Sequence, residues 1–375
     1  MSTNFVLGDR VCLDSHFATI RYLGGIDGTG DDIAWIGLEW DDPARGKHDG
    51  SHKGKTYFVT STPKGGSFVK ANKVEAGIGL VEAVKERYGS VEGQVQVNER
   101  DIKDLQRTMN APFLEMVGFE KINKIQNNFR ALRVIGLKNM RVKGLSENLR
   151  DLAEWIPNVQ DLDLDDNLLT SWDALADIGR QLPRLRALNV SGNRMSAPTD
   201  PAAHAKAFSG LSHLILGRMN LAWEDVLRLT RDLKALKELQ CYDNAITEVG
   251  DLPEGVFRDL DNLDINSNDF KDWKYVSKFS KLPNLKILNL NACGLVTIEA
   301  PSKSESETYF PALKSIQLSF NEINDWQSVT NLMHIKLNEV RIRTNPILET
   351  EQGNFLAIVV QFFVLYTCTH ILLFP

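Results

Sequence analysis

Residues 159–167 read Val-Gln-Asp-Leu-Asp-Leu-Asp-Asp-Asn, and this stretch predicts the fold of most of the chain. Its apolar side chains stand at Val159, Leu162 and Leu164, and Asn167 follows three residues after the last of them. Leu162 and Leu164 alternate around one outward residue, which is the period of a short β-strand. The asparagine suits a tight turn after that strand, because its amide can satisfy backbone groups that the turn leaves unpaired.

The same pattern, L-x-x-L-x-L-x-x-N, returns throughout residues 129–348 and is typical of leucine-rich repeats. Its nine first positions are Leu132, Val159, Leu185, Leu211, Leu236, Leu260, Leu285, Leu313 and Leu337. Six copies keep the asparagine, as Asn167, Asn193, Asn244, Asn268, Asn321 and Asn345, whereas the other three have Met140, Met219 and Cys293. No single coil can bury its apolar residues alone, so we expect an α/β leucine-rich-repeat solenoid with one parallel sheet. We predict a structural role for the asparagines.

Residues that point outward from the predicted strands would line the concave face of the solenoid. As candidates for a protein-binding surface we select Asp161, Asp163, Asp165, Glu238, Tyr242, Asp264, Arg341 and Arg343. This face is acidic to neutral in the middle and basic in the last coil. Three aspartates at alternate positions resemble calcium ligands, but they lack the glycine turn and distal glutamate of an EF-hand, so we predict no metal.

Residues 5–75 predict a separate, small all-β domain, because short apolar runs alternate with Gly, Asp and Pro. The runs are Arg10–Leu13, Thr19–Tyr22, Trp35–Trp40, Thr56–Val59 and Ser67–Val69. Between them lies Gly46-Lys47-His48-Asp49-Gly50. The glycines allow close backbone approach, Lys47 supplies charge, His48 and backbone N–H groups supply hydrogen bonds, and Trp35 and Phe68 supply an apolar pocket. This combination favours an extended acidic peptide that ends in a carboxylate and an aromatic ring. For Trp40, core packing is the favoured alternative.

The segment from Trp35 to Val74 resembles the CAP-Gly domain. The shared features are Gly37, Glu39-Trp40-Asp41, Gly46 to Gly50, Tyr57-Phe58 and Gly66 to Val69. The usual family signature is GKNDG, and His48 here replaces its Asn, a variant that the resemblance associates with the cofactor E branch. The resemblance implies a groove for acidic-aromatic C-terminal tails such as that of α-tubulin.

The composition is that of a soluble globular protein with two or three domains: 375 residues, 43% hydrophobic and 25% charged. A net charge of -6 argues against a protein that wraps nucleic acid.

The four cysteines form no CxxC pair and have no metal-ligand spacing, so we interpret them as buried thiols. No nucleophile–base motif is present, and we predict neither an enzyme nor a cofactor. The N-terminus has no secretory signal, which favours the cytoplasm.

Two further segments complete the expected organisation: a connector at 76–128, with a helix over Val81–Tyr88, and a hydrophobic tail at 349–375. Phe355–Pro375 contains no charged residue. It is long enough to span a membrane. However, Glu349 and Glu351 flank it without Lys or Arg, and Gln361 and His370 interrupt it. We therefore favour an aberrant reading frame over a membrane anchor or a hydrophobic cap on the solenoid.

The order of CAP-Gly module, connector and leucine-rich repeats resembles the tubulin-folding cofactor E family. Gly118–Ile122, Ser171-Trp172 and Trp223 are also similar to that family. Its members normally continue into a C-terminal ubiquitin-like domain, and we find no resemblance to that domain in these 375 residues. The resemblance implies a cytoplasmic, cytoskeleton-associated chaperone that binds the α-tubulin tail and body, works with other tubulin-folding cofactors and assists assembly or disassembly of the α/β heterodimer. The alternative is a microtubule-binding adaptor without folding activity.

Overall fold

The computed structural model describes residues 5–28, 34–88, 129–146, 152–302, 308–349 and 370–372. The chain divides into two units. The first comprises residues 1–183 and 193–198, and the second comprises residues 184–192 and 199–375. The predicted connector beyond residue 88, the family-like segment 118–122 and all of the tail from 350 except 370–372 lie outside the described residues.

The first unit begins with a five-stranded antiparallel sheet in the order β6-β3-β2-β1-β7. Its strands are β1 (Arg10–Leu13), β2 (His16–Gly24), β3 (Trp35–Trp40), β6 (Gly66–Lys70) and β7 (Glu75–Ala76). The short elements beside it are β4 (Ser51–His52), β5 (Lys55–Thr56), η1 (Pro43–Arg45) and η2 (Ala71–Lys73). The predicted all-β module is confirmed.

Alternation along β3 builds the core of this sheet. Ile36, Leu38 and Trp40 are buried in one apolar cluster, and the Trp40 Nε1 donates a hydrogen bond to the Ser67 Oγ over 3.0 Å. Core packing of Trp40, the favoured alternative, is therefore confirmed. Of the predicted run Thr56–Val59, only Thr56 lies in a strand. The chain leaves β conformation there, and the Phe58 ring is buried.

The same unit continues into the first coils of the solenoid. Their elements are β8 (Ile78–Gly79), α1 (Leu80–Tyr88), η4 (Phe129–Ala131), β9 (Val134–Gly136), β10 (Val142–Gly144), α4 (Leu152–Trp155), β11 (Asp161–Asp163) and α5 (Trp172–Arg180). Strand β8 pairs in parallel with β10, and the Val81 N–H donates to the Ser146 Oγ over 2.9 Å. The helix predicted over Val81–Tyr88 is confirmed as α1, and this helix packs on the first coil.

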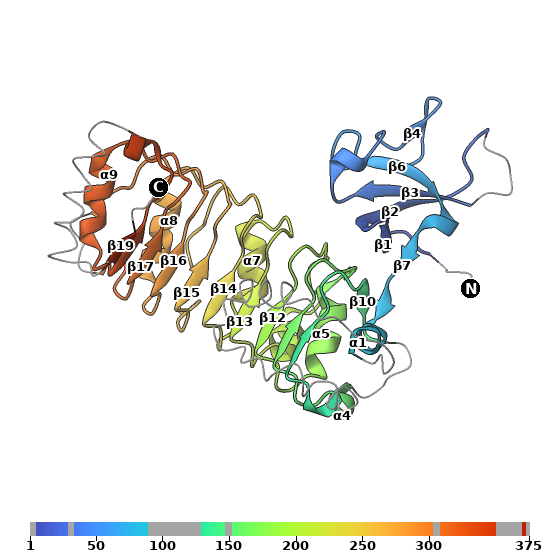
Figure 1. Ribbon diagram of the computed structural model, residues 1–375, viewed down its shortest axis with the longest axis horizontal. Helices are drawn as coiled ribbons and strands as arrows, with labels where there is room; N and C mark the ends of the chain where they lie inside the picture. Colours follow the sequence, from blue (N-terminus) through green and yellow to red (C-terminus); the bar gives the residue numbers. More distant parts are fainter. Residues whose placement is uncertain are drawn as a thin grey trace. The chain divides into compact units, whose positions relative to one another are not determined.

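The second unit contains eight parallel strands that pair in chain order (Figure 1). They are β12 (Ala187–Asn189), β13 (His213–Ile215), β14 (Glu238–Gln240), β15 (Asn262–Asp264), β16 (Ile287–Asn289), β17 (Ser315–Gln317), β18 (Glu339–Arg341) and β19 (His370–Leu372). The other elements are α6 (Pro201–Ala207), α7 (Trp223–Thr230), α8 (Trp273–Val276), η5 (Ser277–Lys281), α9 (Trp326–Asn331), η6 (Leu332–His334) and η7 (Pro346–Glu349). Each of the nine predicted repeats contributes one strand, which begins two residues after its first apolar position. The leucine-rich-repeat solenoid is confirmed.

The recurring asparagines form a buried hydrogen-bond ladder. The Asn268 Oδ1 accepts the N–H groups of Asn244 and Ile246, each over 3.0 Å, and its Nδ2 donates to the Cys241 carbonyl over 3.1 Å. Asn244 bonds in the same way to Met219 of the coil before it. The six ladder asparagines are at most 5% exposed. Their predicted structural role is confirmed, and each one satisfies the coil that precedes it.

On the side of the coils opposite the parallel sheet, three helices begin at buried tryptophans. Trp172, Trp223 and Trp273 open α5, α7 and α8, and each is 1% exposed. A side chain before two of these helices accepts a backbone N–H, as Ser171 does from Ala174 over 3.1 Å. Such caps stabilise short helices by satisfying their first unpaired N–H groups. The local sequence therefore fixes where α5 and α8 start.

The tail is represented by β19 alone, whose backbone pairs with β18. The three interpretations of the tail stay predictions. None of the helices in the described ranges has both the length and the apolar character to cross a membrane.

Candidate peptide-binding site

Five aromatic rings of the N-terminal module gather around Phe68. This aromatic cluster consists of Phe68 and the rings of Tyr22, His48, His52, Tyr57 and Phe58. His48 stacks on Phe68 with ring centroids 4.7 Å apart, and Phe58 meets Phe68 edge-on at 5.3 Å. Phe68 stays half-buried, so part of an apolar ring remains open to a ligand.

The cluster depends on a missing side chain in β3. Gly37 lies opposite Phe68 of β6 and Tyr22 of β2. A Cβ on Gly37 would overlap the Phe58 ring, so the ring fills the space that the glycine leaves. The loop after β5 is thereby held against the outer face of the sheet.

The Gly46-to-Gly50 loop is tied to the same strand by its backbone. The N–H groups of Lys47 and His48 both donate to the Gly66 carbonyl, over 2.7 and 3.1 Å, and the Gly66 N–H donates back to His48 over 2.8 Å. A side chain on Gly46 would clash with the Lys64 carbonyl. Gly50 has φ +98°, and a side chain there would clash with the Phe58 carbonyl. Both glycines are therefore required by close backbone approach.

Hydrogen bonding fixes the protonation of His48. Its Nδ1 accepts the Gly50 N–H over 3.0 Å, so the neutral ring carries its proton on Nε2 and can donate from there. Burial lowers the pKa of His48, because the charged ring would lose solvent. Asp49 accepts the Ser51 N–H over 3.1 Å, and this bond lowers the pKa of Asp49. The aspartate thus shapes the turn.

Unpaired lysines surround the cluster in sequence and give the loops a positive charge. Lys47, Lys53 and Lys64 are exposed, and in the described part of the chain no carboxylate pairs with any of them. Lys55 differs, because its Nζ lies 3.0 Å from the Asp27 carboxylate. A local positive charge on an acidic protein would attract acidic segments.

Trp35 occupies a different place from the other predicted residues. It pairs with Gly24 and Lys70, two residues along β3 from Gly37 and on the same face. Within residues 5–28 and 34–88 no ring contact joins it to the aromatic cluster. Its Nε1 is buried without a hydrogen-bond partner in that part of the chain. Tyr22 and Tyr57 were not selected from the sequence, although both stand in quoted strand runs.

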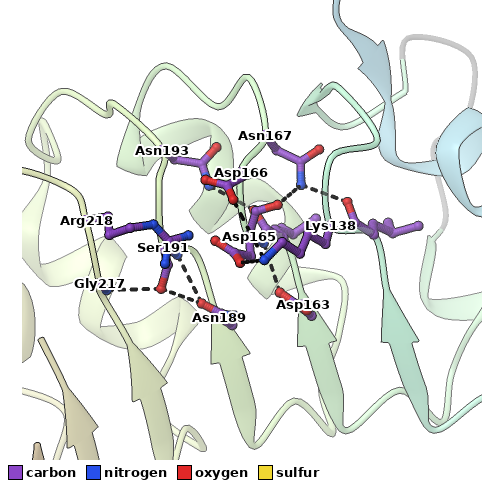
Figure 2. A network of polar contacts seen from close by, with 12 residues as sticks. Lys138, Asp163, Asp165, Asp166, Asn167, Asn189, Ser191, Asn193, Gly217 and Arg218 are labelled. Atoms are coloured by element: carbon purple, nitrogen blue, oxygen red, sulfur yellow. Dashed lines mark hydrogen bonds and ion pairs between the residues drawn. The ribbon is translucent and has the colours of Figure 1, made fainter. Parts of the chain in front are cut away.

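In the first unit, acidic residues that were predicted to line the concave face form internal hydrogen bonds and ion pairs. Asp163 is 5% and Asp165 2% exposed. The Asp163 Oδ1 accepts the Asp165 N–H over 2.9 Å, and the Asp165 carboxylate lies 2.8 Å from the Lys138 Nζ (Figure 2). Burial raises the pKa of Asp163 to about 6. Asp161, at the start of β11, is half-buried.

In the second unit, the predicted acidic residues also form internal hydrogen bonds. Glu238 is buried and accepts the Gln240 Nε2 over 2.6 Å, and burial raises its pKa. Asp264 accepts a hydrogen bond from the Asn289 amide over 3.0 Å, and burial raises its pKa as well. Tyr242 lies over Gly217, where any side chain would overlap its ring. Figure 2 shows Ser191 between Gly217 and Asn189, donating to the latter over 2.7 Å.

The two predicted arginines belong to the last repeat of the predicted concave face. The Arg341 Nε lies 2.8 Å from the Glu339 carboxylate. Arg343 is exposed, and among the described side chains none forms an ion pair with it. The described ranges also contain no cluster of three or more His, Cys, Asp or Glu that could hold a metal.

Comparison with known proteins identifies the family. A CAP-Gly domain model matches residues 7–74. Tubulin-specific chaperone E of Danio rerio is 36% identical over 94% of this chain and 66% of its own length. The Homo sapiens protein of that name is 33% identical over 92% of this chain and 65% of its own length. The chain belongs to the tubulin-specific chaperone E family. It spans slightly less than two thirds of the length of these family members.

Among solved structures, a Bik1 CAP-Gly domain with a peptide from Bim1 is 28% identical, covering 18% of this chain and 78% of its own, at a TM-score of 0.17. An internalin C2 from Listeria monocytogenes is 20% identical, covering 70% of this chain and 92% of its own, at a TM-score of 0.39.

Proposed function

We propose that this chain is a cytoplasmic, cytoskeleton-associated tubulin-folding chaperone that binds α-tubulin and assists assembly or disassembly of the α/β heterodimer. The observation that carries the proposal is its identity of 36% to a tubulin-specific chaperone E over 94% of the chain, through both modules. In this proposal it acts by binding and not as an enzyme. Its partners are α-tubulin and other tubulin-folding cofactors.

The aromatic cluster and the Gly46-to-Gly50 loop would receive the acidic C-terminal tail. Lys47 would attract its carboxylates, the His48 Nε2–H would donate a hydrogen bond, and the half-buried Phe68 ring would contact the terminal aromatic side chain. We include Tyr22 and Tyr57 in this site because their rings meet Phe68 edge-on at 6.3 and 5.5 Å. A charge-assisted hydrogen bond contributes about 1.5–3 kcal/mol, which corresponds to roughly tenfold to a hundredfold in affinity.

Binding of intact and tail-cleaved tubulin to the full chain tests this proposal. Lys47→Ala and Phe68→Ala should each weaken binding of intact tubulin by about tenfold or more. Lys73→Ala is the matched control, because it removes an exposed lysine of the same module from η2. Equal affinity of the wild-type chain for intact and tail-cleaved tubulin would refute the tail site. Preference for polymerised over soluble tubulin in co-sedimentation would favour the adaptor alternative instead.

A further inference from the structure

In the second unit, the residue that precedes the asparagine of each repeat, or Met219 or Cys293 in its place, has a left-handed backbone. The φ angles are +70° at Gly192, +54° at Arg218, +53° at Asp243, +55° at Ser267, +53° at Ala292, +62° at Phe320 and +52° at Thr344. Pairing with the next coil supports this conformation, since six of these residues, from Gly192 to Phe320, donate their backbone N–H to a carbonyl of that coil. Ala292 donates to the Ser319 carbonyl and Phe320 to the Arg343 carbonyl, each over 2.9 Å.

Phenylalanine is a poor choice for such a position. Glycine, asparagine and aspartate tolerate positive φ, whereas a bulky side chain there is strained. Phe257 and Phe310 also have positive φ, but they are only 6% and 3% exposed, so burial of the ring offsets the strain. Phe320 is 62% exposed and gains no such burial.

The exposure of Phe320 is also unusual among the large aromatic residues of this protein. In the described residues no other phenylalanine or tryptophan is exposed. Both its backbone strain and its exposed apolar surface are unfavourable for the isolated chain. Features of this kind are retained at binding sites, where a partner buries the ring.

The neighbouring coil supplies a positive charge. Arg343, whose carbonyl accepts the Phe320 N–H, is exposed and has no carboxylate partner in the described ranges. Phenylalanine and arginine are both enriched at protein interfaces relative to the rest of the surface. Charge complementarity selects an acidic partner surface.

We propose that Phe320 and Arg343 anchor a folded protein whose surface offers an apolar recess beside carboxylates. The proposal rests on the proposed function, in which that partner is the body of tubulin rather than its tail. Phe320 enters the recess and Arg343 pairs with the carboxylates. This contact is separate from the aromatic cluster of the N-terminal module.

The test measures affinity of the full chain for tail-cleaved tubulin, together with thermal stability. Phe320→Asn should weaken binding about tenfold or more while raising the melting temperature by about 2 °C, because asparagine tolerates positive φ. Ala292→Asn is the matched control at the equivalent position, where φ is +53°, and it should raise the melting temperature by a similar amount while leaving the affinity unchanged. Arg343→Ala should weaken binding and reduce its salt dependence.

Each outcome separates the two proposals. If the wild-type chain binds neither intact nor tail-cleaved tubulin, the proposed function fails. If it binds intact tubulin but not the tail-cleaved form, or if Phe320→Asn binds tail-cleaved tubulin as tightly as the wild-type chain, the docking site is refuted.

Discussion

Replacing Asp163 by asparagine should stabilise the protein at neutral pH but not at acidic pH. Asp163 is 5% exposed, and burial raises the pKa of its carboxyl group from 3.8 to about 6. Between these values the folded state binds a proton that the unfolded state has released. Wild-type stability therefore falls as pH rises through this window, and the charged carboxylate costs about 3 kcal/mol above it.

Asparagine fits this position in other coils of the same chain. The Asn289 Oδ1 accepts the Asn291 N–H over 3.1 Å, as the Asp163 Oδ1 accepts the Asp165 N–H over 2.9 Å. The variant should keep this bond and lose the buried charge. Hence Asp163→Asn should be more stable than the wild-type chain by about 3 kcal/mol at pH 7.5 and nearly equal to it below pH 4.

Urea unfolding followed by circular dichroism at several pH values between 3.5 and 7.5 measures this difference. Asp161→Asn, which changes a half-buried aspartate of the same strand, is the control and should show a smaller pH dependence. A stability change that is equal at every pH, or a loss of stability at pH 7.5, would refute the reasoning. A gain in stability with weaker tubulin binding would indicate that the charge serves recognition.

Two further substitutions test the ladder and the N-terminal loop. Asn268→Ala leaves the buried N–H groups of Asn244 and Ile246 without an acceptor, so it should lower the free energy of unfolding by about 2–6 kcal/mol, measured with urea. Asn284→Ala, which removes an exposed bond to the Arg258 carbonyl, should cost about 1 kcal/mol or less. Because burial lowers the pKa of His48, the unfolded ring takes up a proton first, and stability of the module should fall as pH drops through about 6.5. His48→Asn keeps an acceptor for the Gly50 N–H and should flatten this pH dependence in thermal melts; an unchanged profile would argue against the assignment.

The sequence predicted the solenoid well because each repeat contacts only its neighbours. A fixed spacing from Leu236 to Asn244 is enough to place a strand, a turn and a ladder amide. The Gly46-to-Gly50 loop could be predicted because its glycines form a compact motif, and close approach of the Lys64 and Phe58 carbonyls requires Gly46 and Gly50.

Contacts between distant segments were harder to predict. The Phe58 ring is buried because Gly37, on another strand, has no side chain, and no local pattern of Thr56–Val59 reveals this. Likewise, strand alternation suggests an outward Asp165, but Lys138 from the preceding coil pairs with it and the carboxylate is buried. In both cases the outcome depends on a partner whose identity the local period does not encode.

The direction of the asparagine ladder has a consequence for synthesis on the ribosome. Asn268 supplies the acceptor for backbone groups of the coil that holds Asn244, 24 residues earlier. A newly translated coil therefore lacks its closing bonds until the asparagine of the following coil has left the exit tunnel. At about 5–20 residues per second, this delay is on the order of 1–5 s for each coil. The nascent solenoid thus always carries one unfinished coil at its growing end, and a pause in translation within a repeat prolongs the exposure of that coil to chaperones and proteases.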